Sequence, residues 1–140
     1  MLILDTDHLT ALDRQSAVGG RLERRLESRR AEVCTTIVAV SEQLSGLQAL
    51  IAQSRKEAEL IENYGRLARK LEDLQEFVVL AWTADASGEY KQLRQARIRI
   101  GTMDLRIASI ALTHDATLLS RNLRDFTKIP NLRVEDWLQE

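Results

Sequence analysis

The chain opens with the stretch Leu2-Ile3-Leu4-Asp5-Thr6-Asp7, and this stretch decides the fold class. Three consecutive apolar residues are typical of a short strand that is buried on both faces of a sheet. Similar apolar runs predict further strands at residues 33–37, 77–82 and 117–119, and a short fifth strand at residues 132–134. We expect the strand at residues 77–82 to be buried like the first one.

The segments between these runs carry apolar residues at helical spacing. Val18, Leu22 and Leu26 recur every four residues, and periodic stretches also cover residues 40–51 and 60–74. Strands that alternate with helices form right-handed βαβ units. The sequence therefore predicts an α/β fold, a three-layer α/β/α domain with a central, mostly parallel sheet of four to five strands. No repeat or Gly/Pro-rich linker interrupts residues 1–140, so we expect one domain.

Composition narrows the functional classes. With 20 Lys+Arg and 21 Asp+Glu the formal net charge is -1, so bulk positive charge cannot attract nucleic acid. Cys34 is the single cysteine, which excludes an internal disulfide and suits a small buried hydrophobe. No apolar stretch approaches the roughly 20 residues that span a bilayer, and the apolar N-terminus lacks the basic region of a signal peptide. These features predict a cytoplasmic protein.

Acidic side chains follow the predicted strands. Asp5 ends the first strand, Glu42 lies in the first helical turns after the second, and Asp104 lies at the start of a later helix. The turn beyond the fourth strand holds Asn122 and Asp125. Because the carboxyl ends of parallel strands meet at one edge of the sheet, we expect these side chains to converge there.

Carboxylates that gather at one edge repel each other, and a hard divalent cation such as Mg²⁺ or Mn²⁺ removes that cost. Zinc is a poor alternative because His8, His114 and Cys34 are too few and too scattered. Each acid also has an ordinary interpretation as a loop or helix-cap residue. Asp104 in particular is expected in the first turn of a helix that Thr102 caps.

Four stretches together carry a recurring pattern, in a consistent order and spacing along essentially the whole chain. They are the strand ending in Asp5-Thr6-Asp7, the run ending in Ser41-Glu42, the segment Gly101-Thr102-Met103-Asp104, and Ser120-Arg121-Asn122 before Asp125-Phe126. This pattern resembles the motifs of PIN-domain nucleases. The ending Val134-Glu135-Asp136-Trp137 is similar to that of VapC-type toxins within the family.

The resemblance implies a Mg²⁺ or Mn²⁺ site formed by Asp5, Glu42 and Asp104, and endonucleolytic cleavage of RNA. It also implies the toxin half of a toxin–antitoxin pair, usually a homodimer that a small antitoxin silences near the acidic pocket. Asn122 stands where the family often has Asp. Either Asp125 compensates for the missing charge, or a second metal is held weakly.

The expected mechanism is metal-assisted hydrolysis of the RNA phosphodiester. A metal held by Asp5 and Asp104 lowers the pKa of water from about 15.7 toward neutrality. Glu42 either completes the coordination or orients the nucleophilic water.

Polar and basic neighbours are candidates for binding the substrate. Thr6 and Ser120 are expected to donate hydrogen bonds to the carboxylates or to phosphate, or to serve the structure alone. Arg106 and Arg121 flank the motifs and are candidates for binding RNA, in a salt-sensitive way. For most of the basic residues nearby, a solvated helix face is the better interpretation; they include Arg94, Arg97 and Arg99.

The long helical stretch at residues 42–76 is expected to form a protruding pair of helices around Arg55-Lys56. This pair either packs on the sheet or grips an antitoxin or second subunit. Two rival functions stay open. One is a PIN fold with weakened acids that only binds RNA or a partner; the other is a phosphate-binding regulator that uses Asp5, for which Lys128 is poorly placed.

Overall fold

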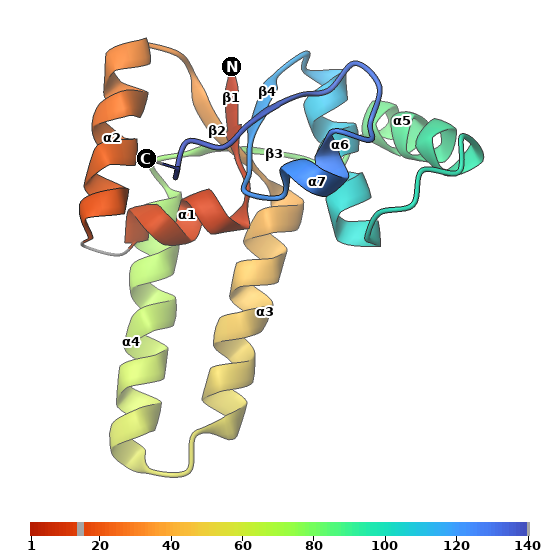
Figure 1. Ribbon diagram of the computed structural model, residues 1–140. Coiled ribbons are helices and arrows are strands. Elements are labelled where there is room, and N and C mark those ends of the chain that lie inside the picture. The colour runs from red at the N-terminus through yellow and green to blue at the C-terminus, as the bar shows by residue number, and fades with distance from the viewer. Residues whose placement is uncertain (14–15, 140) are drawn as a thin grey trace.

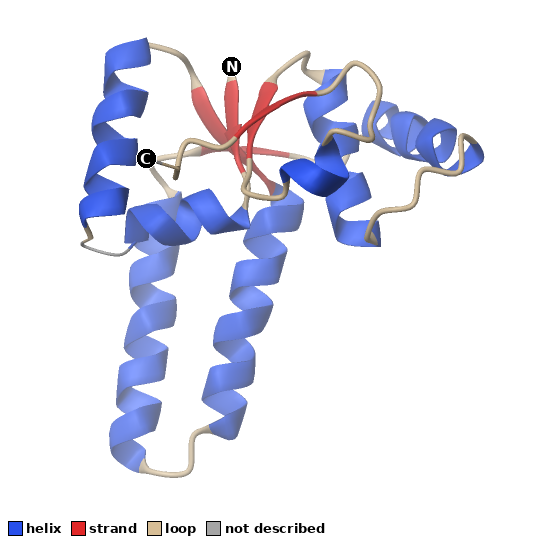
Figure 2. Cartoon of the chain, viewed as in Figure 1, coloured by secondary structure: helices blue, strands red, loops and turns tan. Residues whose placement is uncertain are grey.

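The computed structural model describes residues 1–13 and 16–139, and a parallel sheet forms its centre (Figures 1 and 2). The order across the sheet is β3-β2-β1-β4-β5, and every neighbouring pair is parallel. The strands are β1 (Leu2–Leu4), β2 (Val33–Thr36), β3 (Val78–Leu80), β4 (Thr117–Leu119) and β5 (Arg133–Glu135). The chain leaves β1 for β2 on one side and returns to β4 on the other. A crevice therefore opens between the carboxyl ends of β1 and β4.

Helices cover both faces of this sheet. Leu2 and Leu4 of β1 pack with α1, α2 and the C-terminal segment, whereas Ile3 packs with α5 and α6. This alternation follows from the two-residue period of a strand, and it confirms the three-layer α/β/α prediction. The helices are α1 (Thr6–Asp13), α2 (Ala17–Arg29), α3 (Ile37–Gln53), α4 (Glu57–Leu74), α5 (Ala84–Gln95), α6 (Thr102–Thr113) and α7 (Leu123–Phe126).

Two helix starts differ from the sequence-based expectation. Helix α1 was not predicted, and it begins at Thr6 directly after Asp5. In α6 the N-cap is Gly101 rather than Thr102, which lies inside the helix, but Asp104 is in the first turn as expected. The chain enters α3 as soon as β2 ends, because the Thr36 hydroxyl caps the helix by accepting from the Ala39 N–H at 3.1 Å.

The expectation of a buried strand at residues 77–82 is wrong. Strand β3 is shorter, and Val78 and Val79 are 49% and 36% exposed. The reason is position, since β3 forms an edge of the sheet and only Leu80 packs into the core. Cys34, by contrast, is fully buried in β2 as predicted.

Helices α3 and α4 form an antiparallel pair that projects away from the sheet, as predicted (Figure 1). We call this pair the arm (residues 37–74). None of the residues of α4 is fully buried, and Ile61 is 68% exposed. In the described part of the chain, no helix is both long and apolar enough to cross a bilayer.

Candidate active site

Asp5 is fixed at the crevice between β1 and β4. Its backbone N–H donates to the Leu119 carbonyl at 3.0 Å, so the residue continues the pairing of the two strands. Its carboxylate accepts from the Ser120 hydroxyl at 2.7 Å and from the Thr6 N–H at 2.8 Å. Asp5 is 7% exposed, and both of its side-chain oxygens therefore have a defined partner.

Thr6 connects Asp5 to the acid on the arm. The Thr6 hydroxyl lies 3.3 Å from Oε2 of Glu42 and 3.5 Å from Oδ1 of Asp5. Glu42 is in the second turn of α3, and the short passage from β2 into this helix brings it to the crevice. The predicted hydrogen bond from Thr6 to a carboxylate is thus present in the structure.

Asn122 connects Ser120 to the remaining acids. Its backbone N–H donates to the Ser120 hydroxyl at 3.1 Å, and its side-chain Nδ2 donates to Asp104 at 3.0 Å and to Asp125 at 3.1 Å. Because both neighbours are carboxylates, the amide turns its nitrogen toward them and not its oxygen. The structure therefore brings every predicted acid into one hydrogen-bonded network in which neutral side chains separate the charges.

Burial and mutual repulsion disfavour ionisation of these acids. Burial, and to a smaller extent the nearby charges of Asp7 and Asp104, raise the pKa of Asp5 from 3.8 to about 6 against the opposing hydrogen bonds from Ser120 and Thr6. Burial also raises the pKa of Glu42 and of Asp104, with the charge of Asp104 adding to the effect on Glu42. The charge of Asp104 therefore raises the pKa of two acids on other elements, Asp5 and Glu42.

Comparison with known proteins assigns the chain to a family. The family model described as PIN domain matches residues 2–132. The chain belongs to the PIN-domain family. This assignment excludes the interpretation as a phosphate-binding regulator. Lys128, the lysine considered for that function, instead forms an exposed ion pair with Asp125 at 3.3 Å.

Individual relatives of this PIN domain cover most of its length. Ribonuclease VapC2 from Rickettsia felis is 34% identical over 106 residues, which cover 73% of this chain and 75% of the relative. The structure of VapBC2 from Rickettsia felis, bound to a DNA fragment from its promoter, has a TM-score of 0.72 and 25% identity and covers 97% of this chain and 98% of that chain. A toxin–antitoxin complex from Klebsiella pneumoniae shares the fold, with a TM-score of 0.71, 20% identity and 98% coverage of both chains.

The donor set of this PIN domain suits a hard divalent cation. Its acids offer carboxylate oxygens, which Mg²⁺ and Mn²⁺ prefer, and they share a repulsion that a cation would relieve. Within the residues that the structure describes, no three His, Cys, Asp or Glu side chains already stand close enough to enclose an ion. The donor chemistry fits such a metal, whereas the spacing of the side chains in this structure does not enclose one.

The predicted RNA-binding arginines lie in two different settings. Arg121 is exposed beside the crevice, and its backbone N–H donates to Asp7 at 2.9 Å. The Arg106 guanidinium lies over the ring of Tyr90 at 5.8 Å, and Arg94 approaches the same ring at 5.9 Å. The flanking basic side chains, Arg97 and Arg99, are exposed.

Asp7 is a site residue to which sequence reasoning gave no role. Burial alone would raise its pKa, but hydrogen bonds from His8 and from the Arg121 N–H outweigh burial and lower the pKa overall. Asp7 therefore stays ionised beside the crevice. The available signal was its place in the Asp5-Thr6-Asp7 stretch, two residues after the first acid.

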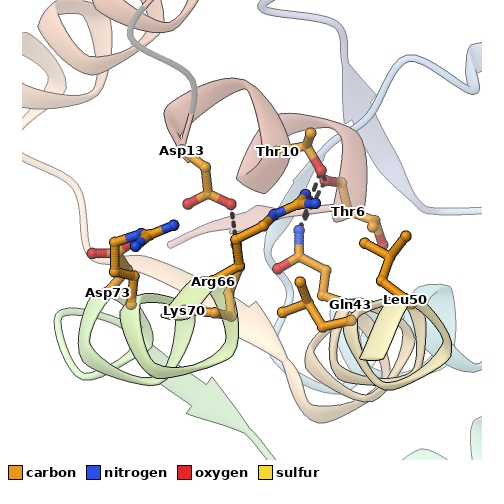
Figure 3. Close-up of a pocket in the computed structure, with 11 residues that line it drawn as sticks. Thr6, Thr10, Asp13, Gln43, Leu50, Arg66, Lys70 and Asp73 are labelled. Atoms are coloured by element: carbon orange, nitrogen blue, oxygen red, sulfur yellow. Dashed lines mark hydrogen bonds and ion pairs between the residues drawn. The ribbon is translucent and has the colours of Figure 1, made fainter. Parts of the chain in front are cut away.

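A groove of about 560 Å³ lies beside the crevice, between α1 and the arm (Figure 3). Thr6 and Gln43 line the end near the acids, and Lys70 reaches across from α4 to form an ion pair with Asp13. The side chain of Gln43 donates from Nε2 to Thr10 at 3.3 Å, while its buried Oε1 has no hydrogen-bond partner among the residues that the structure describes. The remaining lining residues are Gly46, Leu47, Leu50, Arg66, Arg69 and Asp73.

Proposed function

We propose that this PIN domain is a Mg²⁺- or Mn²⁺-dependent endoribonuclease that acts as the toxin of a type II toxin–antitoxin pair. The observation that carries the proposal is the hydrogen-bonded network that gathers Asp5, Glu42 and Asp104 at the crevice. Membership of the PIN-domain family supports the reaction class, and the relative named Ribonuclease VapC2 supports RNA as the substrate.

The residues of the network have distinct tasks. Asp5, Glu42 and Asp104 would hold the cation, and the bound cation supplies a Lewis acid that acidifies water and offsets charge on the scissile phosphate. Ser120 orients Asp5 by its short hydrogen bond, and Thr6 holds Glu42 toward the same point. Such partners orient the ligand side chains, and the acids would still move closer together when the cation binds.

Asn122 replaces a charge with a donor at the fourth position. Its amide holds Asp104 and Asp125 apart without adding to the repulsion between them. Asp125 joins the network through the Asn122 amide, and it is also paired with Lys128. We therefore assign Asp125 to the outer side of the metal site, and we expect one tightly held cation.

The RNA backbone is proposed to cross the crevice beside Arg121 and Arg106. Arg121 is exposed next to the acids, and Arg106 is two residues after Asp104 on α6. Their positive charge would hold phosphates near a site that is otherwise negative, and this part of binding would weaken with salt.

The groove between α1 and the arm is proposed to hold the antitoxin. Arg66 and Arg69 line it beside the Lys70–Asp13 ion pair and Asp73, so the lining keeps one positive charge in excess, which favours an acidic segment. Among the described residues no donor reaches the buried Oε1 of Gln43, and an occupant of the groove that donates to it would offset a cost of about 1–3 kcal/mol. Thr6 lies in both the groove and the acid network, so an occupant of the groove would reach the active site.

We further propose a homodimer in the cytoplasm. The free edge of β3 presents the apolar side chains of Val78, Val79 and Trp82, which are 49%, 36% and 38% exposed. Ile37 lies next to them, because its neighbour Thr36 pairs with Leu80. A second copy would cover this surface, which otherwise leaves an edge strand open.

The decisive experiment is cleavage of RNA by the purified chain, freed of any partner. We expect cleavage of single-stranded or structured RNA with Mn²⁺ or Mg²⁺, its loss in EDTA, and its loss in Asp104→Asn. Asp85→Asn is the matched control, because Asp85 is an exposed acid in the first turn of α5. Cleavage in EDTA, or full activity in Asp5→Ala, would overturn the mechanism.

The rival function, an RNA- or partner-binding module without catalysis, predicts a different outcome. Asn122 at the fourth position is the observation that favours it, because that position carries no charge. It requires tight binding of RNA or of a partner and no cleavage across diverse RNAs at any metal concentration.

A further inference from the structure

His8 is a buried polar residue that the proposed mechanism does not use. It lies in the first turn of α1 and its side chain is fully buried, between the crevice and the C-terminal segment. An imidazole in such a place must have both ring nitrogens satisfied, and here each nitrogen has a different partner.

The two partners of His8 fix its tautomer. The Trp137 backbone N–H donates to Nε2 at 3.2 Å, and Nδ1 lies 2.6 Å from Oδ1 of Asp7. Because a backbone N–H can only donate, Nε2 carries no proton, and the proton on Nδ1 is donated to Asp7. His8 therefore accepts a hydrogen bond from the C-terminal segment and donates one to Asp7.

Asp7 passes this connection on to the active site. Its second oxygen, Oδ2, accepts from the Arg121 N–H at 2.9 Å, so the carboxylate bridges α1 and the turn after β4. The next residue in that turn is Asn122, which donates to Asp104. Asp7 thus fixes the position of the turn at residues 121–122. Asn122 in this turn fixes the position of Asp104, one of the proposed metal ligands.

The C-terminal end of the connection is itself anchored. The Trp137 side chain is only 5% exposed, and the Arg25 guanidinium of α2 lies 4.1 Å from its ring centre. The indole N–H donates to Glu135 at 2.6 Å. The carboxylate of Asp136 lies 3.9 Å from Nε2 of His8, and is the other acid that faces the ring.

We propose that His8 is a positioning residue of the nuclease, which holds Asp7 and thereby the 121–122 turn in the geometry that the acid network needs. The inference rests on the proposed function, since it concerns the same active site. It assigns no chemical step to His8, which lies away from the crevice and acts through Asp7.

Two substitutions separate the two nitrogens. In His8→Asn the side-chain amide occupies the place of Nδ1, donates to Asp7 and loses the acceptor for Trp137. In His8→Gln the amide occupies the place of Nε2, accepts from Trp137 and loses the donor to Asp7. Both variants bury an amide of similar polarity, so a loss of fold stability alone affects them alike.

The test measures kcat and KM of RNA cleavage together with hydrogen exchange of the Arg121 amide. We expect His8→Gln to lower kcat about 10- to 100-fold with little change in KM, because misplaced ligands slow the reaction. The Arg121 amide should also lose protection in this variant. We expect His8→Asn to keep kcat within about threefold and to keep that protection, and its melting temperature serves as the stability control.

Each possible result of this experiment either supports or contradicts the positioning role of His8. Equal kcat in both variants, or losses of kcat that simply follow the melting temperature, would overturn the inference. If the parent chain does not cleave RNA, the proposed function fails, while the hydrogen exchange of Arg121 still decides whether His8 holds the turn. Unchanged protection of Arg121 in His8→Gln would sink the positioning role by itself.

Discussion

The first turns of α3 pack Val38 and Ala39 into the core and bring Glu42 to the crevice. The distal half of the same helix pairs with α4 away from the sheet, and there Leu50 is 37% exposed. At the crevice each acid has a polar partner, whereas the arm leaves apolar and basic groups open. The difference indicates that internal hydrogen bonds hold the acids of the crevice, while the arm leaves an exposed surface that a partner would cover.

The strongest way to break the crevice is to remove one of its neutral connectors. We expect Ser120→Ala to lower metal affinity or kcat about 10- to 100-fold, because Asp5 and the Asn122 N–H both lose their partner. Cleavage rates across a Mn²⁺ titration measure this effect. Ser109→Ala is the control, since Ser109 is equally buried but bonds only the Leu105 carbonyl of its own helix. Equal losses in both variants would indicate a stability effect alone.

The groove side of the arm should respond in partner binding and not in catalysis. We expect Arg66→Glu to weaken binding of the antitoxin, the short protein that we expect from the adjacent reading frame, about tenfold or more through charge reversal. Calorimetry measures the affinity, and RNA cleavage by the free variant should stay unchanged. Arg55→Glu at the tip of the arm is the matched charge reversal outside the groove. The groove assignment is wrong if both reversals weaken binding equally.

The buried charge of Asp5 should make the metal-free protein less stable at neutral pH. The pKa of Asp5 is about 6 in the folded chain against an ordinary value of 3.8. Its contribution to stability is therefore complete below pH 4 and is lost as the pH rises through 6. We expect Asp5→Asn to raise the free energy of unfolding in EDTA at pH 7.5 by about 1–2 kcal/mol.

The gain from Asp5→Asn should shrink as the pH falls to 4.5, because the carboxyl of the parent chain is then protonated in the folded state. Urea unfolding at the two pH values measures the difference. An equal gain at both values, or a loss at pH 7.5, would contradict an unfavourable buried charge at this position.

The smallest effect is expected on the outer face of the arm. Ile61 is 68% exposed, so Ile61→Ser should change the free energy of unfolding by less than about 0.5 kcal/mol in the absence of a partner. Leu47→Ala on the buried side of the same arm should cost about 2–5 kcal/mol. Similar costs for the two variants would mean that the arm already has a packing partner on both sides.

Local sequence patterns predicted much of the fold and of the acid set. Strand β1 is a continuous apolar run, β2 and β4 combine apolar residues with threonine, and Asp5 and Asp104 are next to elements whose ends the sequence marks. Helix α1 was not predicted because its eight residues contain few apolar groups at helical spacing. Its first turn is held instead by tertiary contacts of Asp7 and His8. The edge position of β3 was not predicted either, because the order of the strands depends on the whole sheet.

Two contacts between distant residues were beyond sequence reasoning. The Trp137 N–H meets His8 across 129 positions, and no local spacing reports that meeting. The groove likewise depends on how α1 and α4 face each other, with Lys70 reaching Asp13 across 57 positions. A histidine within an otherwise apolar surrounding was the one available signal for the first contact, and it was too general to use.

The central position of β1 in the sheet also affects how the chain folds during its synthesis. The hydrogen-bond partner of Asp5, Ser120, follows it by 115 positions along the chain. Strand β1 lacks its neighbour β4 until then, and the crevice has only one wall. The acid network therefore stays incomplete in a growing chain until Ser120 has been synthesised.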